Sequence, residues 1–236
     1  MMAALNDFKK DFKKLSRPAD ALILQRFFKT GPGEYGEGDI FAGIKVPPCR
    51  ELAKKYKDLS FGDLQKLIRS PIHEERTIAL MILSLQFKKA DEVQQTKIYK
   101  FYFKNVKGIN NWDLVDGSAP YIVGPYLEER DRKILYKLAR SKNLWEKRIA
   151  MLSTFHFIRQ KDFADALKIA EILLHDKHDL MHKAVGWMLR EIGNRDLATE
   201  KKFLNKHAAT MPRTALRYAI EKFPEAERKK YMKMKD

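Results

Sequence analysis

The segment from Asn110 to Gly117 places two carboxylates beside a tryptophan. Asp113 and Asp116 stand three residues apart, so a helix would bring them to nearly one face, and Asp116 follows Trp112 by four residues, which also makes these two neighbours on a helix. A carboxylate among basic residues keeps a low pKa, because opposite charge favours its ionised form. Such a group can stabilise a developing positive charge or orient water, as glycoside hydrolysis requires. We expect Asp113, at the helix start, to act as an N-cap, a role that explains less for Asp116.

The three tryptophans of the chain are Trp112, Trp145 and Trp187. An indole ring in a basic cleft can stack on a sugar, a base or a cation, and a cation over its face gains ~0.5–2 kcal/mol. Trp112 and Trp187 lie near equivalent positions of their helical segments, and we consider both as ligand contacts. The alternative is that all three rings belong to the core, which we retain for Trp145 because its neighbours are apolar.

A G-x-G-x-x-G pattern occurs at Gly31, Gly33 and Gly36. We reject it as a nucleotide site, because no strand precedes it, Pro32 interrupts it, and the acidic residues around it would repel a phosphate. The segment 31–48 is instead predicted to be a flexible connection.

A histidine cluster at His175, His178 and His182 has spacings that a metal could use. The sequence HDKHD around it is typical of a polar turn between helices, so we expect no metal site there. The single cysteine, Cys49, cannot form an internal disulfide. No P-loop, G-x-S-x-G or Cys–His pair indicates phosphoryl or acyl chemistry, and we expect no cofactor.

Charge and length restrict the class of protein. The 236 residues carry a formal net charge of +16, and 44% of them are hydrophobic, so the chain can bury a core while attracting polyanions. The alternative is that the charge only keeps a helical protein soluble. No apolar run is long enough for a membrane span and the N-terminus lacks a signal peptide, so we expect a cytoplasmic protein.

The dominant period of the sequence is helical. Apolar residues recur at three- and four-residue spacing in segments 72–87, 144–158, 180–193 and 213–223, separated by stop signals such as Gly124-Pro125 and Met211-Pro212. No comparable stretch alternates with period two. We therefore predict an all-α protein.

These four segments align on a basic residue followed by apolar ones. The aligned residues are Arg76, Arg148, Lys183 and Arg213, at spacings of 72, 35 and 30 positions. The gap of 72 holds one further unit, 110–124, roughly midway. The resulting degenerate period of 30 to 37 residues, with one antiparallel helix pair per unit, is typical of a HEAT-like α-solenoid. Equivalent helices of a solenoid line one concave face, so we predict a basic stripe, formed by these four residues, on a concave face. We expect a single domain over 1–236, with N-terminal helices and a loop in 1–48 and repeats in 49–236.

Four sequence blocks, in their order along the chain, resemble segments of the bacterial DNA alkylation repair glycosylases of the AlkD type, which are built from HEAT-like repeats. The blocks are FAGIKVPPCR (41–50), NWDLVD (111–116), NLWEKRIAML (143–152) and KAVGWMLRE (183–191). The resemblance implies that Asp116 is the catalytic aspartate, that Trp112 and Trp187 flank the lesion, and that Arg148 contacts the DNA backbone. We add Arg76, Lys183, Arg190, Arg213 and Phe27 as expected DNA-binding residues.

Two positions depart from the family's pattern. Asn111 stands where the family often has a second tryptophan, and Phe27 where we expect a tyrosine. We expect the first change to fall in packing and the second to remove a hydroxyl that contacts DNA. Neither touches Asp116, Trp112, Trp187 or Arg148, so activity is expected to survive.

The resemblance implies a monofunctional DNA glycosylase that excises cationic bases such as N3-methyladenine and N7-methylguanine from duplex DNA, without an enclosed base pocket. We expect a monomer, associated with the nucleoid through DNA, that needs no metal. The alternative is a non-catalytic relative that binds DNA by shape, which would be favoured if Asp116 pointed into the core. A protein-binding scaffold is disfavoured by the repeated basic residues.

Overall fold

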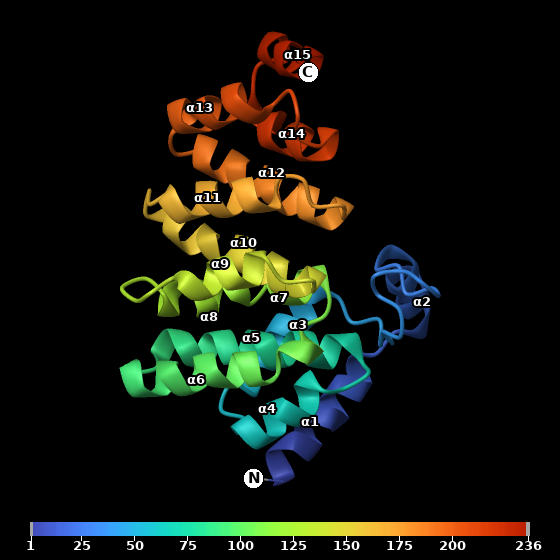
Figure 1. The fold of residues 1–236 in the computed structure, drawn as a ribbon. Helices are drawn as coiled ribbons and strands as arrows, with labels where there is room; N and C mark the ends of the chain where they lie inside the picture. The colour runs from blue at the N-terminus through green and yellow to red at the C-terminus, as the bar shows by residue number, and fades with distance from the viewer. Residues whose placement is uncertain (1, 235–236) are drawn as a thin grey trace. The chain divides into compact units, whose positions relative to one another are not determined.

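The computed structural model describes residues 2–234, and these form fifteen α-helices and two short 3₁₀-helices without a β-strand (Figure 1). The all-α prediction is confirmed. The chain divides into two compact units, Met1–Ile122 and Val123–Asp236, so the predicted boundary at residue 48 falls inside the first unit. No helix within residues 2–234 is long and apolar enough to cross a membrane.

The first unit is organised around one long helix. Its helices are α1 (Met2–Leu15), α2 (Pro18–Phe27), α3 (Val46–Lys55), α4 (Phe61–Ile68), α5 (His73–Lys89), α6 (Glu92–Lys104), α7 (Trp112–Asp116) and the start of α8 (Ala119–Tyr126), with the 3₁₀-helix η1 (Val106–Gly108). Helix α5 packs against α3, α4, α6 and α7 and contributes fully buried apolar residues to the core, among them Ile78, Ile82 and Leu83.

The second unit repeats helix pairs joined by short turns. Its helices are α9 (Lys133–Ala139), α10 (Leu144–Arg159), α11 (Ala164–Leu173), α12 (Asp179–Gly193), α13 (Leu197–His207), α14 (Arg213–Ala219) and α15 (Glu225–Lys233), with η2 (Ile220–Lys222). Helix α12 packs against α10, α11, α13 and α14. Short turns make successive helices antiparallel, and Figure 1 shows them stacked pair upon pair within this unit.

Helix starts in the second unit follow local sequence signals. Asn143 accepts hydrogen bonds from the first backbone amides of α10, and Asp196 caps α13 in the same way, as these residue types favour. Gly186 allows α12 to approach α14 closely, because a Cβ there would lie 2.3 Å from the carbonyl oxygen of Ala215. This close contact fixes the helix that carries Trp187.

The segment 31–48 is not merely a flexible connection, which corrects the prediction. Asp39, Phe41 and Ile44 are buried, and Ile40 forms an isolated parallel bridge with Ile72. The sequence signals of glycine and proline describe only the first part of this segment, which is largely exposed. Its second part, residues 39–45, is an ordered segment over the first turn of α5, and we call this segment the strap.

Candidate functional site

Helix α7 presents two different sides. Leu114 and Val115 are buried, whereas Trp112, Asp113 and Asp116 are partly exposed. The helix has five residues, and Asp116 is the last of them, directly before an exposed glycine. Trp112 and Asp116, four residues apart, are therefore both partly exposed residues of this helix.

Trp112 lies on a stack of aromatic rings from the first unit. Its ring is nearly parallel to that of Phe28, at 5.2 Å between centroids, and Phe28 in turn stacks on Phe41 at 4.9 Å. Phe27 meets Trp112 edge-on at 6.1 Å and is 62% exposed. One face of the indole is thus packed against protein, in the offset and edge geometries that aromatic pairs prefer.

The N-cap of α7 is Asn111 and not Asp113, which corrects the prediction. Asn111 is fully buried; its Oδ1 accepts from the backbone amide of Trp112 at 2.8 Å, and its Nδ2 donates to Asp39 at 3.1 Å. Asp113 instead points back into the protein, where its Oδ2 lies 2.8 Å from Nε2 of His73. The departure from the family pattern at position 111 therefore falls in packing, as expected.

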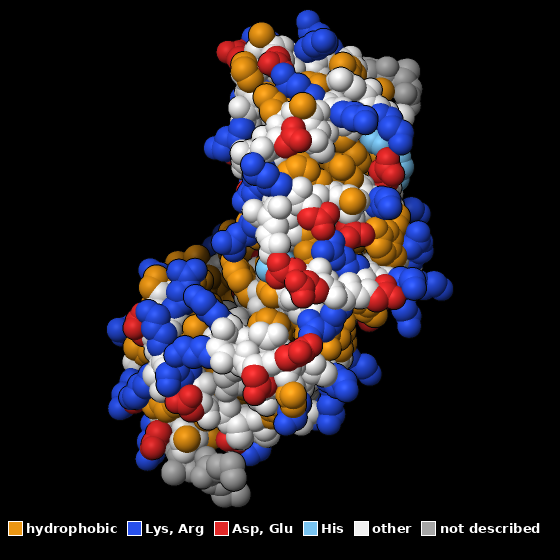
Figure 2. Space-filling view, turned by 90° about the vertical axis from the view of Figure 1, so that its left-hand side faces the viewer, with side chains coloured by type: hydrophobic (Ala, Val, Ile, Leu, Met, Phe, Trp, Pro, Cys, Tyr) orange, Lys and Arg blue, Asp and Glu red, His pale blue; other side chains and the backbone are white. Residues whose placement is uncertain are grey.

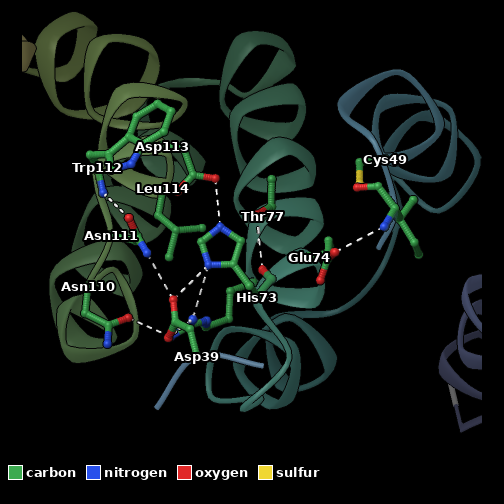
Figure 3. Close-up of polar contacts among 12 residues, drawn as sticks. Asp39, Cys49, His73, Glu74, Thr77, Asn110, Asn111, Trp112, Asp113 and Leu114 are labelled. Atoms are coloured by element: carbon green, nitrogen blue, oxygen red, sulfur yellow. Dashed lines mark hydrogen bonds and ion pairs between the residues drawn. The ribbon is translucent and has the colours of Figure 1, made fainter. Parts of the chain in front are cut away.

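A buried polar network lies beneath α7 (Figure 3). His73, the first residue of α5, is 2% exposed, and its Nδ1 lies 2.9 Å from Asp39 on the side opposite Asp113. Arg76, one turn further along α5, donates to Asp39 at 2.5 Å and to Asn110 at 2.6 Å. The network thus ties the strap, α5 and the start of α7 together.

The network holds a charged histidine. Burial disfavours the His73 cation, but the charge of Asp113 and the hydrogen bonds to Asp113 and Asp39 outweigh it and raise the pKa of His73 to about 9. Burial also opposes ionisation of Asp39, yet the hydrogen bond from His73 and the charge of Arg76 hold the pKa of Asp39 below its ordinary value. Both ring nitrogens of His73 therefore donate at neutral pH.

Glu74 fixes the strap from the other side. Its carboxylate accepts from the backbone amides of Ala42 and Gly43 at 2.8 Å, and from that of Ile44 at 3.1 Å. Gly43 has φ +81°, and a Cβ there would lie 2.0 Å from the carbonyl oxygen of Arg17. Only glycine fits this position, so the chain can pass close to the start of α2.

Arg76 is not a surface residue, which corrects its predicted place in the basic stripe. Its side chain is 6% exposed, and its contacts with Asp39 and Asn110 lie within the first unit. A guanidinium enclosed in this way cannot reach a phosphate. The alignment of basic residues identified Arg76 by position, but the buried carboxylate of Asp39 decides its role.

In the second unit, Trp187 lies on the middle of α12 and is partly exposed. Its Nε1 donates to Glu191 at 3.3 Å, and its ring lies 6.1 Å from that of Phe155 on α10. Arg195 pairs with the same Glu191 at 2.8 Å. These contacts orient the indole along α12, and its expected contact with a lesion stays a prediction.

The other predicted DNA-binding residues of the second unit have partners within it. Arg148 is 4% exposed and donates to the carbonyl oxygen of Leu180 at 2.7 Å. Lys183 pairs with Asp179 at 2.7 Å and keeps 38% of its side chain exposed. Their contact with DNA stays a prediction.

Two arginines complete this set. Arg190 pairs with Glu221, and Arg213 donates to main-chain carbonyls at the end of α15. Figure 2 shows Lys and Arg side chains spread over the visible face, with acidic and apolar side chains between them. The basic stripe stays a prediction for Arg148, Lys183 and Arg213.

The histidine cluster serves local structure. His178 caps α12 by accepting from the backbone amide of Leu180 at 3.1 Å, and His182 contacts the carbonyl of Asp176. Residues 2–234 contain no group of three or more His, Cys, Asp or Glu side chains arranged to hold a metal ion.

Sequence analysis missed His73 and Asp39. They lie 34 residues apart, and Asp113 lies another 40 residues beyond His73, so no local spacing connects the three. The available signal was the run His73-Glu74-Glu75-Arg76 at the start of an apolar helix, where four successive polar residues are all buried. Buried charges need partners, and these come from the strap, from Lys9 of α1 and from the start of α7.

Comparison with known proteins identifies relatives of the whole chain. Residues 8–223 match the model of a family described as DNA alkylation repair enzyme. The chain is also similar to a solved structure from Enterococcus faecalis described as a predicted DNA alkylation repair enzyme, with a TM-score of 0.68 and 15% identity over 89% of this chain and 97% of that one. No curated protein matches significantly. At this identity, the structural match supports the fold alone.

Proposed function

The chain belongs to the family of DNA alkylation repair enzymes, and from this premise we propose that it is a monofunctional DNA glycosylase. Its substrates would be cationic alkylated purines, N3-methyladenine and N7-methylguanine, in duplex DNA. The protein would act as a monomer, without a metal, on DNA in the cytoplasm. The net charge of +16 favours such a polyanionic substrate.

The observation that carries this proposal is that α7 has both buried apolar residues and partly exposed residues. Its apolar residues Leu114 and Val115 are buried, while Trp112 and Asp116 share the partly exposed side. Asp113, the other carboxylate of the helix, is bound to His73. We assign the chemistry to Asp116 because it lies at the partly exposed end of α7, where the family resemblance also places the catalytic aspartate.

The reaction would proceed by loss of the base. In a cationic purine nucleotide, the C1′–N bond breaks with its electron pair moving to the base, which leaves as a neutral molecule. The deoxyribose then carries the positive charge, which an ionised carboxylate at Asp116 would stabilise. Water adds at C1′ and releases a proton. The exposed face of Trp112 would contact the electron-poor sugar.

A base-release assay tests the proposal. Purified protein is expected to release N7-methylguanine or N3-methyladenine from methylated duplex DNA, and Asp116→Asn is expected to lower the rate by about 10²–10³-fold, because an electrostatic stabiliser is lost. Binding to undamaged duplex should stay unchanged, as measured by fluorescence anisotropy. Equal release by Asp116→Asn and the unmodified protein would exclude the catalytic role of this residue.

The alternative function, a non-catalytic protein that binds DNA by shape, predicts that Asp116 belongs to the core. Its side chain is partly exposed, and this favours the enzyme. Absence of base release by the unmodified protein, together with tight binding to duplex DNA, would favour the alternative.

A further inference from the structure

Helix α7 is too short to be stable without contacts from the rest of the first unit. Its five residues form little more than one turn, and isolated helices of this length are unstable in water because nucleation is costly. Its position must therefore come from contacts with the rest of the first unit. Its polar contacts include the Asn111 cap and the hydrogen bond between Asp113 and His73.

His73 is the central member of these contacts. It bridges Asp39 in the strap and Asp113 in α7, at 2.9 and 2.8 Å, while its ring stacks on Phe41 at 4.5 Å and approaches Phe28 at 5.0 Å. The aromatic stack that supports Trp112 and the polar network beneath α7 thus meet at one side chain.

The charges around His73 balance only when the imidazole is protonated. The charged groups that face it are Asp39 from the strap, Asp113 from α7 and Arg76 from its own helix. Two cations then oppose two anions. A neutral imidazole would leave one uncompensated negative charge in a buried site, one helical turn from Asp116, and a like charge nearby disfavours an ionised carboxylate.

We propose that His73 is a positioning residue that acts as a buried cation, holding α7 through Asp113 and keeping Asp116 ionised by compensating the Asp113 charge. This inference rests on the proposed function, since it assigns the groups that prepare Asp116 for its role. It also gives the two carboxylates of α7 different roles. Asp113 serves structure and charge balance, and Asp116 is the carboxylate that we assign to the substrate.

The primary test is His73→Gln, with Asp116→Asn measured in parallel. Glutamine can donate a hydrogen bond to Asp113 but carries no charge. We expect kcat for base release to fall by about 10- to 100-fold, as small displacements of catalytic groups do, with little change in binding to undamaged duplex. The acid limb of the pH–rate profile should move to higher pH, because an uncompensated charge on Asp113 would disfavour an ionised carboxylate one helical turn away.

The double variant His73→Gln, Asp113→Asn separates charge from simple structural support. It removes the cation and the anion together, so the acid limb should return to that of the unmodified protein even where kcat stays reduced. A matched control is His207→Gln in the second unit, which removes another histidine–carboxylate pair, with Glu171 at 3.0 Å. This control should leave kcat and the pH profile unaltered.

Nuclear magnetic resonance of the unmodified protein tests the charge directly, even where a variant fails to fold. The imidazole nitrogens of His73 should both be protonated from about pH 6 to about pH 8, consistent with a pKa of about 9. A neutral His73 at pH ~7 would overturn the inference, as would an unshifted acid limb in folded His73→Gln. Failure of the unmodified protein to release any base would instead overturn the proposed function, which separates the two outcomes.

Discussion

The two tryptophans that resemble the family's lesion contacts are held in different ways. Trp112 begins a five-residue helix and rests on stacked rings above a buried network of charges. Trp187 sits in the middle of a 15-residue helix, and its indole nitrogen is bound by Glu191 from the next turn of that helix. One residue depends on distant parts of its unit, and the other mainly on its own helix.

This difference follows from helix length. A long helix packed on four neighbours fixes its side chains through its backbone and apolar contacts, so exposed pairs on its surface add little. A single turn has no such support and requires partners from elsewhere. The first unit provides them by burying charged side chains at the start of α5, which is costly unless each charge is paired.

The largest expected effect is on the network itself. Asp39→Ala leaves His73 and Arg76 as buried cations without their shared carboxylate, and we expect a loss of about 3–5 kcal/mol in the free energy of unfolding. Glu221→Ala is the matched variant in the second unit, because the Arg190–Glu221 pair is more exposed, with 51% of the Glu221 side chain accessible. It should cost no more than about 1 kcal/mol. Urea unfolding measures both, and equal losses would remove the contrast between the units.

A second effect concerns a buried acid of the second unit. Glu200 is 1% exposed, its Oε1 has no hydrogen-bond partner, and burial raises the pKa of Glu200 to about 8. Between about pH 4.5 and about pH 8, the unfolded chain loses this proton while the folded chain keeps it. Glu200 therefore makes the protein less stable as pH rises through this range.

The variant Glu200→Gln should remove that dependence and stabilise the protein by about 1–3 kcal/mol near the upper end of the range. The contrast with the first unit is that Asp39 and Asp113 have cationic partners whereas Glu200 has none within hydrogen-bonding distance. Thermal unfolding at several pH values measures the effect, and an unchanged pH dependence in Glu200→Gln would contradict it.

The smallest expected effect compares two residues of the aligned basic set. Lys183→Ala should reduce the slope of log Kd against log salt for duplex DNA by about 1, since one phosphate contact would be lost. Arg76→Gln should leave the slope unchanged wherever the protein stays folded, because Arg76 is enclosed by Asp39 and Asn110. A reduced slope for Arg76→Gln would contradict its reassignment.

Local patterns in the sequence were sufficient for some features and not for others. The apolar period of 144–158 and 180–193 correctly predicts α10 and α12, because an amphipathic repeat reports which side of a helix is buried. The same reasoning placed Arg76 and Arg148 at equivalent positions but could not show that both side chains are buried. Burial of a charged residue depends on partners that a helical repeat does not encode.

Asp113 illustrates the same limit. Aspartate and asparagine both favour the N-cap position, and the sequence does not show that Asn111 takes this role while Asp113 turns toward His73. The prediction was wrong because two residue types suited to capping stand two positions apart. The buried histidine, 40 residues earlier, decides between them.

The sequence by itself determined the all-α class, the positions of the long helices α5, α10 and α12, the excess of positive charge and the helical spacing of Trp112 and Asp116, since each depends on composition or on spacing within one helix. Only the tertiary structure decided which charges are available for a substrate. It brings Asp39, His73 and Asp113 within hydrogen-bonding distance although they are far apart along the chain, and in a buried site it is this proximity that sets which group is charged and which is neutralised.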